Sequence, residues 1–430
     1  MKPLSEHVFG KGTVAARKYA LENGLGVILV ADRSAPICAY QTWFRVGSRH
    51  EQVGRTGLAH LFEHLMFNQT ENLAPGEFDR RLEALGADTN AATWLDWTYY
   101  RDNVPSRHLE TVMALEAERM AKLVLNEPQL EAERSVVSNE RRQRVDDDVD
   151  GFLGEQLYKL AYDAHPYRWP TIGWMEDIQA ITLEDARSFY KTFYSPNNAT
   201  VIIVGDFEEE QALALLQRHY GGLAPQSIPE GAMVVEPEGT GERRAVFGKQ
   251  VMTDRLLMGW RACGMAHTDH AALEIAAELL FNGQSSILYR RLVAELEIAS
   301  TLGADTPSFR DPGLFEVKVS MQRGHRAKAA EEVIDAELSR MGQVPVAEPV
   351  LAKAKNRLES HLWHALRPHE GKAEAIGHHE TTAGDYGLLF EIDRRVREVT
   401  PESLMAVMAH YFDASRRSVV VAEPAKRGRK

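Results

Sequence analysis

Residues 60–68 read His60-Leu61-Phe62-Glu63-His64-Leu65-Met66-Phe67-Asn68, and this stretch decides how the rest of the chain is interpreted. On a helix, residues four apart lie one above the other, so both imidazoles share a face and the Glu63 carboxylate lies beside them. The apolar residues cover most of the remaining circumference, which indicates an enclosed helix. Buried imidazoles need partners, and a metal ion is one. The pattern predicts a two-histidine metal site with a base attached; the alternative is a pair of capped or solvated histidines on an amphipathic helix.

The same stretch has a diverged copy in the second half of the chain. Leu65-Met66-Phe67-Asn68 is followed by Leu85-Gly86-Ala87-Asp88-Thr89, and Leu279-Leu280-Phe281-Asn282 is followed by Leu302-Gly303-Ala304-Asp305-Thr306. Pieces that recur in the same order predict an internal duplication. Aligning the two copies puts Glu274, Ala277 and Glu278 at the positions of His60, Glu63 and His64. The second copy lacks the polar set, so the asymmetry favours a chemical role for the first.

Around this stretch, helical and strand patterns alternate, which predicts an α+β protein. We expect 26–31 and 37–46 to form an opening hairpin or adjacent strands. Further strand-like runs lie at 91–104 and 200–205, and helical runs at 58–67, 77–85, 107–125 and from 128 past 144. A stretch rich in Gly, Pro and Glu between 221 and 243 breaks the pattern. The predicted domains are 1–228 and 244–430, joined by a linker at 229–243.

Composition excludes several classes of function. At 430 residues the chain favours two or three domains. A net charge of -12 and a pI near 5.8 argue against nucleic acid, and no stretch approaches the roughly 20 apolar residues of a membrane helix. Cys38 and Cys263 are expected as buried thiols, with no disulfide. No apolar segment of a signal peptide follows Lys2, so we expect a cytoplasmic protein; a processed periplasmic chain with a new start would look the same.

A third metal ligand is expected from another element. Catalytic zinc sites commonly add a carboxylate to two histidines and keep a further position for water. Glu133 and Glu140 lie seven residues apart in a helical pattern, two turns along one face. Either acid can therefore point inward.

The inverted motif H-x-x-E-H, with Glu140 about 76 residues beyond His64 in an Asn-Glu pair, resembles the inverzincin family of zinc metallopeptidases. This family includes pitrilysin, insulin-degrading enzyme and mitochondrial processing peptidase, and the size resembles its small bacterial two-domain members. Similar blocks cover most of residues 20–210. They are Gly57-Leu58-Ala59, Leu65-Met66-Phe67, Asn90-Ala91-Ala92-Thr93, Asp96-Trp97-Thr98-Tyr99-Tyr100, 193–200 and Gly205-Asp206-Phe207.

The resemblance implies a zinc-dependent endopeptidase with one Zn²⁺ per chain, held by His60, His64 and Glu140. Glu133 would be an acid beside a ligand that steadies the site. Glu63 would be the general base for a zinc-bound water that attacks the scissile carbonyl. The implied fold is two homologous α/β-sandwich domains, each a mixed, largely antiparallel sheet with helices on one face, together half of a clamshell.

The resemblance also implies how peptides and partners bind. Asn90 and Ala91 would lie on an edge strand that accepts the peptide as an added strand; an ordinary strand start is the alternative for Asn90. An Arg and Tyr pair is expected in the second half, where 308–317 offers Arg310 but no Tyr in the positions that follow. A homologous sister subunit would then supply the pair in a heterodimer; a homodimer, or an active site completed differently, is the alternative.

Two other functions stay open. A non-catalytic scaffold of the same fold is one, although intact His60, Glu63, His64 and Glu140 argue against it. A dedicated peptidase that processes one precursor is the other. A second metal at Gly377-His378-His379-Glu380 is not expected, since adjacent histidines point to different helix faces. The acidic run 146–150 lacks the Gly and terminal Glu of a calcium loop and is expected as a solvated turn.

Overall fold

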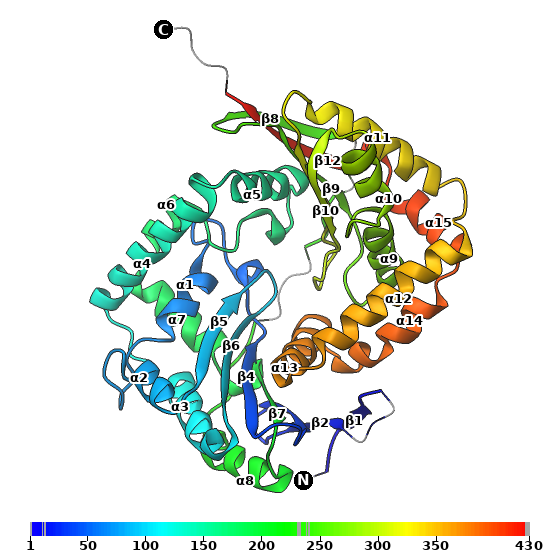
Figure 1. Cartoon of the computed structure of the whole chain (residues 1–430). Coiled ribbons are helices and arrows are strands. Elements are labelled where there is room, and N and C mark those ends of the chain that lie inside the picture. Colours follow the sequence, from blue (N-terminus) through cyan, green and yellow to red (C-terminus); the bar gives the residue numbers. More distant parts are fainter. Residues whose placement is uncertain are drawn as a thin grey trace. The chain divides into compact units, whose positions relative to one another are not determined.

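Two β-sheets organise the chain, and each lies in its own compact unit (Figure 1). The computed structural model describes residues 2–10, 12, 14–229, 234–237, 239 and 241–425. Unit 1 comprises Met1–Glu140, Pro170–Met233 and His364–Phe390. Unit 2 comprises Arg141–Trp169, Val234–Trp363 and Glu391–Lys430. The two units are therefore interleaved along the sequence.

Unit 1 is built on a seven-stranded sheet in the order β1-β2-β3-β7-β4-β6-β5. Its strands are β1 (Ser5–Val8), β2 (Ala15–Ala20), β3 (Gly26–Ala31), β4 (Ile37–Phe44), β5 (Asp88–Thr93), β6 (Thr98–Pro105) and β7 (Ala199–Gly205). Its helices are α1 (Leu58–Leu65), α2 (Glu77–Ala84), α3 (Leu109–Lys122), α4 (Glu127–Arg141), α6 (Met175–Ala180), α7 (Leu183–Phe193), α8 (Glu209–Tyr220) and α13 (His369–His378). Strand β7 is buried along its whole length, as its run of Val and Ile residues requires.

Unit 2 is built on a five-stranded sheet in the order β10-β11-β9-β12-β8. Its strands are β8 (Arg243–Lys249), β9 (Arg255–Arg261), β10 (Ala299–Asp305), β11 (Leu314–Met321) and β12 (Arg417–Pro424). Its helices are α5 (Val149–Ala161), α9 (His270–Leu280), α10 (Ile287–Tyr289), α11 (Ala327–Met341), α12 (Glu348–Ala365), α14 (Ile392–Glu398) and α15 (Pro401–Tyr411). Alternate residues of β9, such as Met258 and Trp260, pack with Ile275 of α9 and Ile334 of α11 in one core.

The two sheets share one topology. Five strands of unit 1 run β3-β7-β4-β6-β5, and those of unit 2 run β8-β12-β9-β11-β10. In each set the first pair is parallel and the other three are antiparallel. The predicted α+β fold with two related, largely antiparallel sheets is confirmed.

One expectation about strand pairing is wrong, and one sequence likeness does not correspond to a structural one. Strands β3 and β4 are neither a hairpin nor neighbours, because β7 lies between them and pairs with both. The two Leu-Gly-Ala-Asp-Thr segments are not equivalent either. The first runs from the turn before β5 into that strand, whereas Leu302–Asp305 lie within β10 at its end. The two similar sequence segments thus occupy different positions in the two hairpins.

Each sheet is covered by a helix from the other half of the sequence. Helix α5 packs on β9 and β12, and α13 packs on β4 and β7, the equivalent strands of the other sheet. The compact units therefore differ from the predicted sequence domains, because 141–169 belong to unit 2 and 364–390 to unit 1. The division at 229–243, drawn from the stretch rich in Gly, Pro and Glu, stays a prediction. Residues 230–233, 238 and 240 of that linker lie outside the described residues.

Helix α13 is fixed to unit 1 at both ends. At its start, the ammonium group of Lys372 lies 3.0 Å from a carboxylate oxygen of Asp32. Burial alone would raise the pKa of Asp32, but the bonds from Lys372 and Ser34 lower it to about 2. Beyond its end, buried Glu380 accepts a hydrogen bond from Lys18 at 2.7 Å. Gly377 faces the indole of Trp43 so closely that a Cβ would lie 2.2 Å from the ring.

Two helical glycines give a matched test of this packing. Gly154 of α5 has open space around its missing Cβ, so Gly154→Ala should raise stability by about 0.5–1 kcal/mol through helix propensity. Gly377→Ala has the same gain in propensity but forces Cβ into Trp43, and should destabilise by about 1–3 kcal/mol. Thermal unfolding of both variants measures the difference. Equal stabilisation by both would contradict the close approach.

Candidate metal centre

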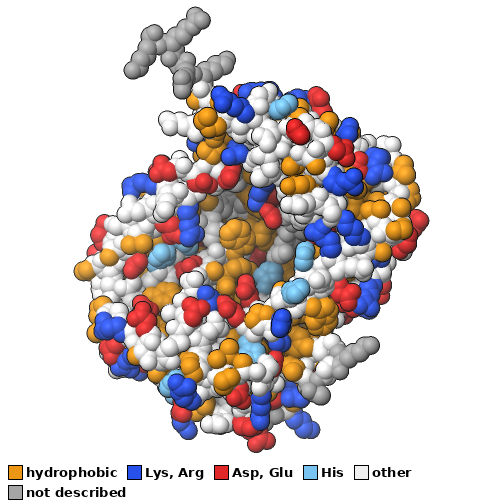
Figure 2. Space-filling view, viewed as in Figure 1, with side chains coloured by type: hydrophobic (Ala, Val, Ile, Leu, Met, Phe, Trp, Pro, Cys, Tyr) orange, Lys and Arg blue, Asp and Glu red, His pale blue; other side chains and the backbone are white. Residues whose placement is uncertain are grey.

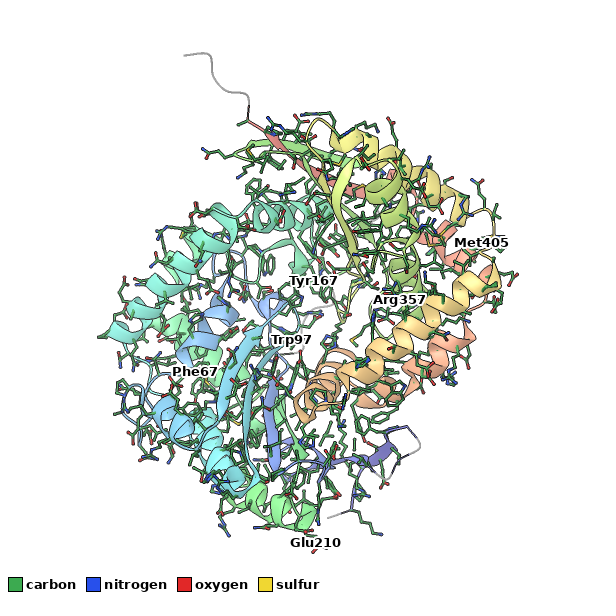
Figure 3. The ribbon with its side chains drawn as sticks, viewed as in Figure 1. Phe67, Trp97, Tyr167, Glu210, Arg357 and Met405 are labelled. Atoms are coloured by element: carbon green, nitrogen blue, oxygen red, sulfur yellow. The ribbon has the colours of Figure 1, made fainter. Side chains whose placement is uncertain are left out.

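The predicted motif lies on α1, a short and largely buried helix. Leu58, Leu61, Phe62 and Leu65 face the interior, as the apolar spacing predicts. The hydroxyl of Tyr100, on β6, donates to the backbone carbonyl of Phe62 at 3.2 Å. Phe67, labelled in Figure 3, follows the helix and packs edge-on to Phe78 of α2. Packing on several sides therefore fixes the rotation of α1.

The N-terminus of α1 is held by a carboxylate that sequence reasoning missed. The two oxygens of buried Glu51 accept from the backbone N–H groups of Gly57, at 2.9 Å, and Ala59, at 2.7 Å. Gly57 has φ +91°, and a Cβ there would lie 2.6 Å from the carbonyl oxygen of Ile172. No sequence motif marks Glu51, because its role depends on a loop that returns it to the helix.

The three side chains predicted as metal ligands lie together. The Nε2 atoms of His60 and His64 lie 3.6 and 3.4 Å from Oε2 of Glu140. Ligand atoms of these residues all lie within 4.8 Å of one another. His60 is buried, and His64 and Glu140 are half-buried. The structure thus brings α1 and α4 together at the residues that the motif and the resemblance indicate.

The spacing fits a zinc ion. Zinc binds imidazole nitrogen at about 2.0–2.1 Å and carboxylate oxygen at about 2.0–2.2 Å, so tetrahedral ligand atoms lie about 3.4 Å apart. The separations of 3.6 and 3.4 Å from His60 and His64 to Glu140 are close to this value, and all three groups lie within 4.8 Å of one another. Two imidazoles and one carboxylate are also the donor types of a catalytic zinc site.

Acidic groups surround the histidines. Burial alone would lower the pKa of His64, but Glu140, Glu63 and Glu133 outweigh it and raise that pKa. Oε2 of Glu133 lies 3.6 Å from Nδ1 of His64, the ring nitrogen that faces away from Glu140. Within the described part of the chain, Glu63 and Glu133 are outside the three-residue cluster. Both carboxylates contribute to the charge around His64 from outside that cluster.

Asn90 and Ala91 lie on β5, the edge strand of the unit 1 sheet. Strand β5 pairs with β6 on one side, and α1 packs against it. The side-chain oxygen of Asn90 accepts from the backbone N–H of Ala91 at 2.9 Å. The edge position agrees with the expectation, whereas the Asn90 side chain makes a local bond within its strand.

The second copy has a guanidinium near the equivalent place. Glu278, aligned with His64, is buried in α9 and forms an ion pair with Arg357 of α12, labelled in Figure 3. His361 of α12 lies 4.0 Å from Glu278. Among the described residues, only His60, His64 and Glu140 form a group of three or more possible ligands. The second copy therefore holds an internal cation beside its buried acid.

Arg310 lies in the connection between β10 and β11 and is exposed. Its neighbours are fixed by side chains from the α5 region of unit 2. The Tyr162 hydroxyl donates to the carbonyl of Pro312 at 2.9 Å, and the Tyr167 hydroxyl accepts from the N–H of Asp311 at 3.1 Å. Both tyrosines are buried, and their hydroxyls are engaged with the backbone.

The remaining expectations concern groups away from this centre. His379 bonds the carbonyl of Ala375 through Nδ1 at 2.8 Å, and no metal cluster includes it among the described residues. Cys38 and Cys263 are buried, and burial raises their pKa values to about 12 and 11. No described helix is long and apolar enough to cross a bilayer. Figure 2 shows acidic and basic side chains intermixed over the visible face.

The chain is similar to two protein-family models and to a named bacterial protein. A family model described as "Insulinase (Peptidase family M16)" matches residues 26–173, which hold His60, Glu63, His64, Glu133 and Glu140. A model described as "Peptidase M16 inactive domain" matches residues 180–358. The chain is 31% identical to the zinc protease PqqE of Helicobacter pylori, over 94% of this chain and 92% of that protein.

Solved structures of other proteins share the fold of this chain. A crystal structure of a protease from Helicobacter pylori superposes with a TM-score of 0.91 at 30% identity, covering 95% of this chain and 99% of that one. The periplasmic protease PqqL from Escherichia coli matches with a TM-score of 0.79 at 19% identity, which shows a shared fold. This chain covers 48% of that longer protein, with 97% of its own length aligned.

Glu51 offers a test of how the metal helix is held. Glu51→Gln leaves one oxygen for two N–H donors, so one N–H of α1 would face an amide NH₂ instead. We expect a loss of about 1–3 kcal/mol of stability. The exposed Glu22→Gln is the control, with an expected change below about 0.5 kcal/mol. Equal thermal midpoints for the two variants would argue against the role of Glu51.

Proposed function

This chain belongs to the M16 peptidase family, and we propose that it is a zinc-dependent endopeptidase whose metal is held by His60, His64 and Glu140. Glu63 is the general base in this proposal, and Glu133 supports His64. The observation that carries it is the convergence of three ligand groups from α1 and α4 within 4.8 Å of one another. Relatives named zinc protease support the choice of metal.

The charge around the site also supports a bound cation. Glu63, Glu133 and Glu140 bring three carboxylates to two imidazoles, and together they raise the pKa of His64 against the effect of burial. The same field that favours a proton on the imidazole favours a divalent cation. A metal ligand must be deprotonated, so the ion would displace that proton.

The metal and the side chain of Glu63 have separate roles in peptide hydrolysis. Zinc, when bound, supplies a Lewis acid that stabilises charge on the scissile carbonyl oxygen and lowers the pKa of a nearby water. Glu63 accepts the proton of the attacking water and returns it to the leaving amine. This role needs a carboxylate that lies beside the ligands without being one, and Glu63 is outside the three-residue cluster.

Strand β5 is the proposed binding edge for the peptide. An extended peptide that pairs with an edge strand gains backbone hydrogen bonds for any sequence, which suits a general peptidase. Asn90 and Ala91 lie at the middle of this strand, and α1 packs against it. The Asn90 side-chain oxygen would have to release the Ala91 N–H if an incoming carbonyl takes that bond.

Replacing the base separates metal binding from turnover. Glu63→Gln should hold one zinc per chain and lose about 10²- to 10⁴-fold in kcat, because the amide cannot accept the proton. His60→Ala should lose the zinc. Zinc content by atomic spectroscopy and cleavage of a fluorogenic peptide measure both effects, with the exposed Glu83→Gln as a control. A Glu63→Gln enzyme that turns over at the parent rate would contradict the assigned role, and a parent without zinc would exclude the metal site.

We also propose that a homologous subunit completes the active site. Of the expected Arg and Tyr pair, the β10–β11 connection offers Arg310, which is exposed. Tyr162 and Tyr167 form hydrogen bonds to this connection, but both are buried and their hydroxyls are already bonded to the backbone. The longer periplasmic relative has about twice the length of this chain, so two chains of this size would match one such molecule.

Reconstitution tests this second proposal. The chain purified alone should contain zinc and cleave peptides weakly, and a homologous chain from the same genome should raise kcat at least tenfold. Light scattering gives the mass of each species and distinguishes a heterodimer from a homodimer. Full activity of a zinc-loaded monomer would contradict the need for a partner and leave the metal site intact.

A further inference from the structure

We infer that Asn68 is a positioning residue that holds Glu133 against His64 and thereby sets the imidazole for metal binding. The inference rests on the proposed zinc site. Its basis is a short series of contacts that runs from the end of α1 through α4 and back to a ligand. Neither the motif nor the resemblance singles out Asn68 for this role.

Asn68 contacts Glu133, and Glu133 in turn lies beside His64. The backbone N–H of Asn68 bonds the carbonyl of Leu65 at 3.1 Å, which fixes the turn that ends α1. The side-chain Nδ2 donates to Oε1 of Glu133 at 3.0 Å. The other oxygen of Glu133, Oε2, lies 3.6 Å from Nδ1 of His64. The two oxygens of one carboxylate are thus directed to Asn68 and to the ligand histidine.

This arrangement matters for the state of the imidazole. Nε2 of His64 faces Glu140, so a metal bound there requires the proton of the neutral ring to be on Nδ1. A carboxylate beside Nδ1 favours that tautomer electrostatically and raises the basicity of the ligand nitrogen, and a bound metal would bring the two groups into closer contact. Glu133 is half-buried on a helix and could adopt other rotamers. The bond from Asn68 selects the rotamer that faces His64.

The second copy shows the same residue in another role. Asn282, aligned with Asn68, donates to the carbonyl of Ala304 at 3.1 Å and accepts from its N–H at 3.0 Å. Helices α4 and α12 begin with Glu127-Pro128-Gln129-Leu130 and Glu348-Pro349-Val350-Leu351, and this alignment places Ala354 opposite Glu133. Without an acid at that position, the amide bonds a strand instead. The bond to Glu133 therefore belongs to the copy that carries the histidines.

The test compares zinc affinity in matched variants of the full chain. Asn68→Ala removes the donor, and Asn68→Leu removes it while keeping a branched side chain of similar shape. Both should weaken zinc binding about tenfold, the lower end of what loss of an outer partner of a ligand costs. Asn282→Ala, the same change in the second copy, should lower the thermal midpoint and leave zinc affinity unchanged. Competition with a chromophoric chelator gives the dissociation constants.

A double-mutant cycle identifies the route. Glu133→Gln should also weaken zinc about tenfold, and Asn68→Ala combined with Glu133→Gln should lose much less than the product, because both act through the same contact. The absorption spectrum of the Co²⁺ form should shift in Asn68→Ala, since it reports the ligand field of His64. Unchanged zinc affinity in a folded Asn68→Leu, or multiplicative losses, would overturn the inference. A parent chain that binds no zinc would instead refute the proposed function.

Discussion

The placement of β7 between β3 and β4 is the constraint on which the candidate site depends. The chain leaves β4 at Phe44 and returns to pair with it at Ala199, and all the proposed ligands lie on this excursion. The N–H of Arg45 bonds the carbonyl of Asn198 at 3.0 Å, so the first and last residues of the excursion meet directly. Closing so long a loop costs chain entropy, which the buried Val and Ile residues of β7 offset. The same placement of β12 between β8 and β9 shows that both copies use this closure.

Features that depend on a local sequence pattern could be predicted. Features that depend on a segment far along the chain could be predicted less well. The helical spacing of His60, Glu63 and His64 was enough to predict a shared face, because α1 carries all three. The spacing of Glu133 and Glu140 left two candidates for the third ligand, and the resemblance was needed to choose Glu140. The turn-like residues after β3 suggested a hairpin, but they could not reveal that β7 would enter from far along the chain.

Tertiary placement explains the other gaps. Helix α5 packs on β9 and β12, and α13 packs on β4 and β7, and no local sequence pattern specifies which sheet a helix will cover. Glu51 and Asn68 escaped prediction for a related reason. Their partners are the start of α1 and the middle of α4, and only the folded chain brings these segments to them. Gly377 likewise has no local reason to be glycine; the reason is the indole of Trp43.

The two copies balance the charge of their acids in different ways. In the second copy Glu278 is buried at the position of a proposed ligand, and the guanidinium of Arg357 neutralises it from α12. The alignment of α4 with α12 puts Val136 at the position of Arg357, so the first copy has no cation on α4 at that point. Instead it gathers three carboxylates around two imidazoles, and the raised pKa of His64 is the response of that group to the surrounding charge. Acids gathered around an imidazole favour either protons or a metal ion. The arginine is one of several differences, because His60, Glu63 and His64 also align with Glu274, Ala277 and Glu278, and together these changes give two charge arrangements on a shared fold.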